Sequence, residues 1–167
     1  LNIVMTSDKH QSGTDRVAEV SENYDCDIVI NIQGDEPGID PDLIDKLITL
    51  FDDPKVEMAS VASTDLHKQD FTNDNVVKVN LDNENNAISF VRNNMDPEQI
   101  YYRHIGIYAY RKKTLNFFTS LDQSENEKKY SLEQLRALDN NIAIKLLISD
   151  FNHRSIDTKE DLKNYEN

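Results

Sequence analysis

The sequence predicts an α/β fold with a mixed, mostly parallel sheet and helices on both faces, built as one domain over residues 1–167. The first observation is the order strand–helix–strand–helix along residues 1–51, which is typical of parallel strands joined by covering helices. The second is the size and composition of the chain. Its 167 residues are 38% hydrophobic and 29% charged, which suits one globular domain with one core.

The first half of the chain supplies that alternation. Leu1–Met5 is predicted as a strand, and a helix follows from Ser12, with Ser12 and Asp15 at capping-box spacing. Residues 27–32, DIVINI, read as a buried strand. A second helix is predicted after Asp40 as N-cap, because Pro is favoured at the first helical position and an apolar stripe follows.

The second half mixes short strands with helices. Strands are predicted at EMASVAS (57–63), VVKVNLD (76–82), AISFVR (87–92), YYRHIGIYAYR (101–111) and IAIKLLIS (142–149). DNENN (82–86) reads as the turn of a hairpin. Helices are predicted at KKTLNFFTSL (112–121), YSLEQLRALDN (130–140) and TKEDLKNYEN (158–167).

Charge and composition exclude several classes of function. Eighteen Lys and Arg face 31 Asp and Glu, a formal charge of −13, whereas nucleic-acid binding needs a basic surface. No apolar run approaches the roughly 20 residues that span a bilayer, and the first residues lack a signal-peptide pattern. One cysteine, Cys26, cannot form an internal disulfide, which fits a cytoplasmic location.

The stretch NIQGDEP (31–37) raises the sharpest chemical question, because a buried strand ends in adjacent carboxylates. Ligands of open α/β sheets lie beyond the carboxyl ends of strands, and Mg²⁺ prefers hard oxygen ligands such as Asp35. A solvated acidic turn explains the same residues equally well. The residues alone leave both interpretations open.

Four other places carry candidate residues, each with a plain structural alternative. Ser12–Gly13–Thr14 begins a helix whose free N–H groups could meet a polar ligand, or could simply be well capped. His104 and Tyr108 share one strand face around Gly106, which leaves room for a ligand, although a strand histidine is often a core residue. Glu133 and Gln134 fit ordinary helical polarity, and Asp157 fits an N-cap.

Taken together, these motifs resemble the 3-deoxy-manno-octulosonate (Kdo) cytidylyltransferases, or CMP-Kdo synthetases. The matching pieces are MTSDKHQSGTDRVAE, DIVINIQGDEP, VVKV, YYRHIGIYAYR, SLEQLRAL and IDTKEDL, from the first residue almost to the last. The resemblance implies a nucleotide-diphosphosugar transferase fold and Mg²⁺-dependent transfer of CMP from CTP to Kdo for lipopolysaccharide synthesis. It also implies a cytoplasmic homodimer that contacts through the hairpin at 76–92.

The resemblance also implies roles for particular residues. Asp35 and Asp157 would be the catalytic carboxylates that hold the metal. Ser12, Gly13, Thr14 and Asp15 would meet the cytidine side of CTP. The sugar acid would be surrounded by Gln33, Arg92, His104, Tyr108, Glu133 and Gln134, with Arg92 pairing its carboxylate in bidentate fashion.

One departure from the family pattern concerns the phosphates. The family's first strand and its loop of the type G-R-x-x-S-x-R-L-P-x-K, whose cations hold the triphosphate, have no counterpart in this sequence. The sequence therefore predicts an N-terminally truncated domain with weak or no turnover by itself. Two alternatives stay open: a cytidylyltransferase for another sugar acid, such as amino-Kdo or a sialic acid, and a non-catalytic fragment that dimerises or binds a ligand.

Overall fold

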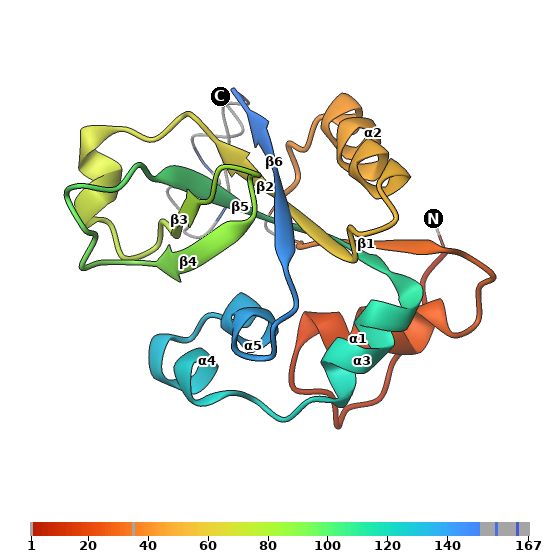
Figure 1. Cartoon of the computed structure of the whole chain (residues 1–167). Coiled ribbons are helices and arrows are strands. Elements are labelled where there is room, and N and C mark those ends of the chain that lie inside the picture. The colour runs from red at the N-terminus through yellow and green to blue at the C-terminus, as the bar shows by residue number, and fades with distance from the viewer. Residues whose placement is uncertain (1, 35, 151–155, 157–162, 164–167) are drawn as a thin grey trace.

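The computed structural model of the chain describes residues 2–34, 36–150, 156 and 163. The α-helices are α1 (Gly13–Ser21), α2 (Pro41–Thr49), α3 (Lys112–Ser120), α4 (Glu125–Tyr130) and α5 (Gln134–Asp139), with 3-10 turns η1 (Leu50–Asp52) and η2 (Lys68–Thr72). The strands are β1 (Ile28–Ile32), β2 (Met58–Ser63), β3 (Lys78–Leu81), β4 (Ala87–Val91), β5 (Tyr102–Arg111) and β6 (Ile144–Ser149). These elements form a mixed α/β fold (Figure 1).

The sheet is mixed, as predicted, but among the described strands its pairings are mostly antiparallel. Its order is β4-β3-β5-β2-β6, with β1 also paired to β5. Only β2 and β6 pair in parallel, within the described part of the chain. The prediction of a mostly parallel sheet was wrong for a topological reason: β1 and β2 run in the same direction, but antiparallel β5 lies between them.

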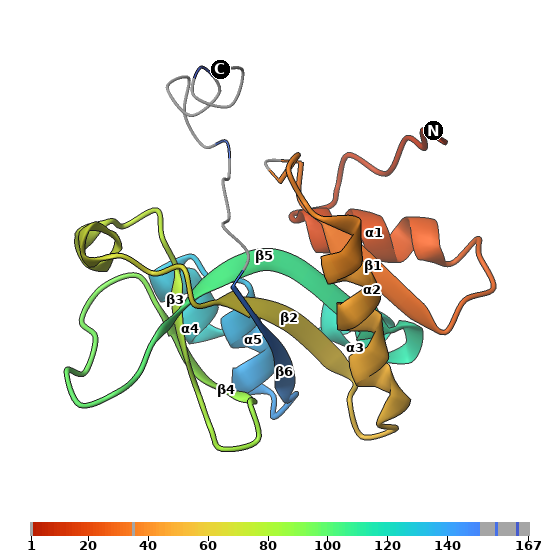
Figure 2. The same ribbon diagram turned by 90° about the horizontal axis from the view of Figure 1, so that it is seen from above.

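Strand β5 is the centre of this arrangement, and Figure 2 shows it as a long curved ribbon. One of its edges pairs with β2. Its other edge pairs with β3 through Tyr102 and Arg103, and then with β1 through residues 107–111. The register with β2 shifts between Ser60 and Val61, an irregularity of the kind that increases local twist and bend.

Helices cover both faces of the sheet, as the sequence predicts. Helix α2 lies on one face, and α1, α3, α4 and α5 lie on the other (Figure 1). Because side chains alternate along a strand, β5 sends Ile105, Ile107 and Ala109 toward Leu43 and Leu47 of α2. The other face packs Tyr108 and Tyr110 of β5 against α1, α3 and α5. We call this second face the substrate face, because two residues predicted to bind the sugar acid, His104 and Tyr108, lie on it.

The local sequence signals account for most helix boundaries. The N–H of Asp15 donates to Ser12 Oγ at 3.1 Å, and the N–H of Ser12 donates to Asp15 Oδ2 at 3.1 Å, which is the predicted capping box of α1. Asp40 caps α2, with Pro41 at its start. Helix α4 was not predicted, although Ser124 and Glu127 form a capping box of the same kind.

Two other predicted elements have different outcomes. The strand predicted at 1–5 is wrong for residues 2–5, which form no strand; among the described residues nothing pairs with them, and Ile3 and Met5 are 90% and 89% exposed. The helix predicted at 158–167 falls outside the described residues except for Lys163, which is helical. In the part of the chain that is described, no helix is long and apolar enough to cross a bilayer.

Candidate functional site

The predicted sugar-acid residues of β5 meet on the substrate face of the sheet. The rings of His104 and Tyr108 lie 5.4 Å apart between centroids, which confirms that they share a face. Phe90 of β4 packs edge-on against His104, with 5.0 Å between centroids. These aromatic contacts form a row from the end of β4 to the middle of β5, and Arg92 follows two residues after Phe90.

His104 is held in place by the neighbouring strand. Its Nε2 lies 2.9 Å from Ser60 Oγ, which also donates to the carbonyl of Ile107 at 2.8 Å. His104 is half-buried, whereas Tyr108 is only 5% exposed. Burial raises the pKa of the Tyr108 phenol well above its ordinary value, so the hydroxyl stays neutral and able to donate.

Gln33 lies over the glycine that the sequence singles out. A Cβ atom added at Gly106 would come 3.5 Å from the side-chain amide carbon of Gln33. The side chain of Gln33, which follows β1 directly, thus covers the space predicted between His104 and Tyr108. Three of the predicted sugar-acid residues therefore converge from two neighbouring strands.

The N-terminus of α1 reaches the same face, where Thr14 joins two other elements. Thr14 is 2% exposed, and its Oγ1 donates to Glu133 Oε2 at 2.6 Å. It accepts from Asn31 Nδ2 at 3.3 Å and also hydrogen-bonds the side chain of Tyr110. The hydroxyl of Thr14 is thus engaged within the protein, and Ser12 and Asp15 are engaged in the capping box, so exposed Gly13 leaves backbone groups as the accessible part of this turn.

Glu133 is the point at which the segment around α5 touches α1. Its Oε1 is buried, has no hydrogen-bond partner among the described residues, and lies 3.6 Å from Nη2 of Arg136. Arg136 in turn donates to both carboxylate oxygens of Glu127, at 2.8 and 2.6 Å, and both side chains are 5% exposed. Gln134, at the start of α5, is 6% exposed.

Sequence reasoning missed several members of this network. Asn31, Glu127 and Arg136 were not singled out, because burial of a polar residue is invisible in a single sequence. The spacing Ser124-x-x-Glu127 was the one available signal, since it marks a capping box. Bidentate pairing of Glu127 with Arg136 is the geometry that makes such charge pairs strong.

Arg92 lies at the end of β4, at the edge of the row of rings. Its Nη1 donates to the carbonyl of Asp74 at 2.7 Å, and its own backbone carbonyl accepts from Lys78 Nζ at 2.7 Å. The side chain of Asn93 donates to Asp74 Oδ1 at 2.5 Å. Residues 73–74 and 92–93 are therefore joined at this corner of the sheet.

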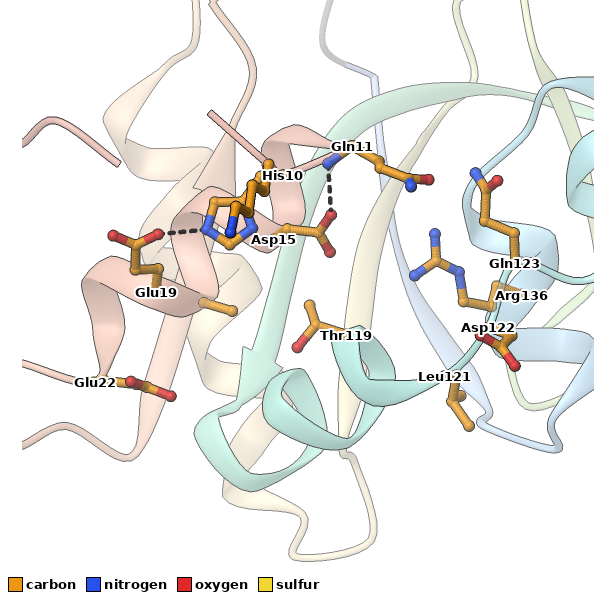
Figure 3. A pocket seen from close by; sticks show the side chains of 12 residues that line it. His10, Gln11, Asp15, Glu19, Glu22, Thr119, Leu121, Asp122, Gln123 and Arg136 are labelled. Carbon is orange, nitrogen blue, oxygen red and sulfur yellow. Dashed lines mark hydrogen bonds and ion pairs between the residues drawn. The ribbon is translucent and has the colours of Figure 1, made fainter. Parts of the chain in front are cut away.

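A cavity of about 520 Å³ lies beside this network, between the start of α1 and the segment that follows α3 (Figure 3). Figure 3 shows Arg136 pointing into it from one side and Asp15 from the other. Glu19, Glu22 and Asp122 add negative charge to its lining. Glu19 is hydrogen-bonded to His10, which lowers the pKa of its carboxyl.

The two carboxylates predicted to hold a metal cannot be placed. Asp35 and Asp157 lie outside the described residues. Over residues 2–34 and 36–150, with 156 and 163, no three His, Cys, Asp or Glu side chains cluster as a metal site. Glu36, beside Asp35, is 8% exposed, and its N–H donates to the carbonyl of Gln33 at 3.2 Å.

The sequence is similar to proteins of a known family. Residues 1–146 match the family model described as Cytidylyltransferase. The 3-deoxy-manno-octulosonate cytidylyltransferase of Bacteroides thetaiotaomicron is 42% identical over 180 residues, covering 98% of this chain and 72% of that protein. The protein of the same name from Koribacter versatilis is 37% identical over 171 residues, covering 99% and 65%. The chain thus spans about two thirds of the length of such relatives.

Solved structures extend the likeness to three dimensions. A CMP:2-keto-3-deoxy-manno-octonic acid synthetase complexed with CTP has a TM-score of 0.89 and 33% identity, over 97% of this chain and 69% of that chain. An inositol-1-phosphate CTP transferase from T. maritima is 22% identical, with a TM-score of 0.54 over 88% of this chain and 57% of that chain. At this identity the likeness supports only a shared fold. The chain therefore belongs to the cytidylyltransferase family and, within it, to the 3-deoxy-manno-octulosonate cytidylyltransferases.

Proposed function

We propose that the polypeptide containing this chain transfers CMP from CTP to Kdo, forming CMP-Kdo and pyrophosphate for lipopolysaccharide synthesis. In this reaction the anomeric hydroxyl oxygen of Kdo bonds to the α-phosphorus, and the bond from that phosphorus to the bridging oxygen breaks as pyrophosphate leaves. The single observation that carries the proposal is the convergence of Gln33, His104 and Tyr108 on one sheet face, beside the α1 terminus.

The residues of this chain would act by positioning. Hydroxyl, imidazole and amide groups suit the several hydroxyls of a sugar acid, and a buried polar site rejects analogues that leave its groups unpaired. Arg92 is suited to the carboxylate, since a guanidinium can bind both oxygens at once. Exposed backbone at Gly13 would meet the cytidine, because the first N–H groups of a helix lack intrahelical acceptors.

We further propose that Mg²⁺ is the cofactor and that Asp35 and Asp157 hold it. Carboxylate oxygen is the donor that Mg²⁺ prefers. When bound, the ion would neutralise charge on the triphosphate, and the formal net charge of −13 on these 167 residues favours such a cation. Asp35→Asn or Asp157→Asn should reduce the rate by at least about a hundredfold, on the scale of lost transition-state stabilisers.

Pyrophosphate release with CTP, Kdo and Mg²⁺ tests the function. The assay is run on the complete polypeptide encoded by the gene and, in parallel, on residues 1–167 alone. Absence of release from the complete polypeptide would refute the proposed activity. Release with amino-Kdo or a sialic acid at a higher kcat/KM than with Kdo would instead favour a related cytidylyltransferase. Release by residues 1–167 alone would refute the non-catalytic alternative, and calorimetry of the same residues with CTP and Mg²⁺ measures whether they bind the nucleotide.

We also propose that these residues work as a single domain in a cytoplasmic homodimer. The hairpin of β3 and β4 is the proposed contact, and its Ile88 side chain is 55% exposed, which favours burial against a second copy. Light scattering should report a dimer for the native protein and a monomer for Ile88→Glu. A native monomer at micromolar concentration would rule the homodimer out.

A further inference from the structure

Lys78 is the one lysine in the described chain that is fully buried, with a relative exposure of 0%. A buried ammonium is costly unless its donors are satisfied. Its Nζ donates to the carbonyl of Asn73 at 2.9 Å and to the carbonyl of Arg92 at 2.7 Å. Lysine is rarely buried, and here its side chain joins the backbone at Asn73 to the backbone at Arg92.

Lys78 reaches Arg92 from the face of the sheet opposite to the row of rings. It pairs directly with Val91 on β4 and with Arg103 on β5, and directly paired residues point to the same face. The neighbouring pair, Val79 and Phe90, points to the substrate face. Lys78 therefore lies behind the corner, where it is shielded from any ligand on the substrate face.

The corner that Lys78 holds also fixes the Arg92 side chain. The ammonium of Lys78 donates to the carbonyl of Asn73. The guanidinium of Arg92 donates to the carbonyl of the next residue, Asp74, and the side-chain amide of Asn93 donates to the Asp74 carboxylate. The backbone and the side chain of Arg92 are thus tied to the same two-residue segment. Behind it, an ion pair of 2.9 Å between Arg103 and Asp70 keeps nearby charge balanced.

We propose that Lys78 is a positioning residue, which sets Arg92 at the orientation that receives the carboxylate of the sugar acid. This inference rests on the proposed function, because Arg92 has a carboxylate to receive only if a sugar acid is the substrate. Lys78 itself touches no substrate. Its effect is transmitted through the Arg92 carbonyl.

The test is Lys78→Met, which keeps an unbranched side chain one atom shorter and removes its donors. The variant leaves the carbonyls of Asn73 and Arg92 without this donor, so some loss of stability is expected. The KM for Kdo should rise roughly tenfold or more, because small displacements of a substrate-binding group are costly. The KM for CTP should stay within about twofold of the native value, because the loss of a contact with Kdo weakens the binding of Kdo and not of CTP.

Lys145→Met is the matched control. Lys145 also donates its Nζ to a backbone carbonyl, that of Glu84, but on β6 and away from Arg92. This variant should keep both KM values. If Lys78→Met does not fold, Lys78→Gln, whose amide can still donate, should give a smaller rise in the KM for Kdo.

A double-mutant cycle separates positioning from general damage. In an Arg92→Ala background, Lys78→Met should cause no additional rise in the KM for Kdo, since coupled residues are non-additive. A full additional rise would overturn the inference, and so would an unchanged KM for Kdo in Lys78→Met alone.

Hydrogen exchange provides a readout that needs no substrate. Lys78→Met should speed amide exchange at residues 91–95 while leaving β6 unchanged. Unchanged exchange at 91–95 would overturn the positioning of this corner even if the native enzyme is active. A native enzyme without pyrophosphate release, with faster exchange in the variant, would instead locate the failure in the proposed function.

Discussion

At the scale of single residues, the substrate face depends on a pair of charges that are almost fully buried. Glu127 and Arg136 are each 5% exposed at the side chain and bind in bidentate fashion. Glu127 also accepts from the N–H of Ser124 at 3.1 Å, so one carboxylate caps α4 and neutralises Arg136. The guanidinium lies over the ring of Phe118 at 4.7 Å, which anchors it to α3.

Removal of one partner of this buried ion pair should strongly destabilise the fold. Glu127→Gln would leave the buried guanidinium without its bidentate partner, and we expect the free energy of unfolding to fall by about 3–5 kcal/mol. Urea denaturation measures this. The control is Glu57→Gln, which removes the partner of Lys113 in an exposed pair at 3.1 Å and should cost less than about 1 kcal/mol. Equal losses of unfolding free energy in the two variants would show that burial does not strengthen the Glu127–Arg136 pair.

Asp70 provides a prediction on pH dependence. Burial by itself would raise the pKa of Asp70, but bonds from the N–H of His67 at 2.8 Å and from Arg103 outweigh it and lower that pKa below its ordinary 3.8. A lowered carboxylate pKa stabilises the fold above pH 3.8, and this contribution is lost as the pH falls through the folded-state value. Asp70→Asn should therefore flatten the dependence of unfolding free energy on pH below 3.8. An acid limb as steep as that of the native protein would refute the assignment.

At the scale of elements, sequence signals worked where the cause is local. The capping box of α1 and the Asp-Pro start of α2 involve residues within one turn, so both helices were predictable. The hairpin of β3 and β4 was predictable for the same reason, with Asn85 in its turn at φ 62°. The strand predicted at 1–5 was wrong for residues 2–5, because a strand forms only with a pairing partner, which local sequence does not reveal.

The two capping boxes allow a matched experiment. Ser12→Ala and Ser124→Ala should each lower the free energy of unfolding by about 1 kcal/mol. Only Ser12→Ala should also raise the KM for CTP, because α1 begins beside the proposed cytidine contacts and α4 does not. Denaturation and steady-state kinetics on both variants measure this. A similar rise in KM for Ser124→Ala would argue against a nucleotide role for the α1 terminus.

At the scale of the whole molecule, the sheet separates two hydrophobic cores, one beneath α2 and one on the substrate face. Leu47 is 0% exposed in the core beneath α2, on the face opposite to the proposed site. Leu47→Ala should lower the free energy of unfolding by about 2–5 kcal/mol, while the KM for Kdo stays within about twofold at a temperature where the variant is folded. Denaturation and kinetics together measure this, and a large rise in that KM would show that the faces are not separate.

The sequence did not reveal how the candidate site residues contact one another. Resemblance assigned Thr14 to the nucleotide and Glu133 to the sugar acid, yet the structure joins them by a hydrogen bond of 2.6 Å. Such a contact spans 119 positions of sequence and depends on how α1 and α5 pack. Lys78 escaped notice for a related reason, since a lysine in a strand pattern is expected at the surface. Burial and long-range pairing are properties of the folded chain as a whole.

The central place of β5 has a consequence for how the chain is made. During synthesis β1 and β2 emerge before β5, and among the described strands neither pairs with the other, because each bonds to β5, whose residues 102–111 come much later. Non-local pairings of this kind slow folding, and unpaired apolar strands favour aggregation meanwhile. Residues 28–63 therefore leave the ribosome before the strand with which they pair. A chaperone that binds nascent chains would protect these residues most from aggregation.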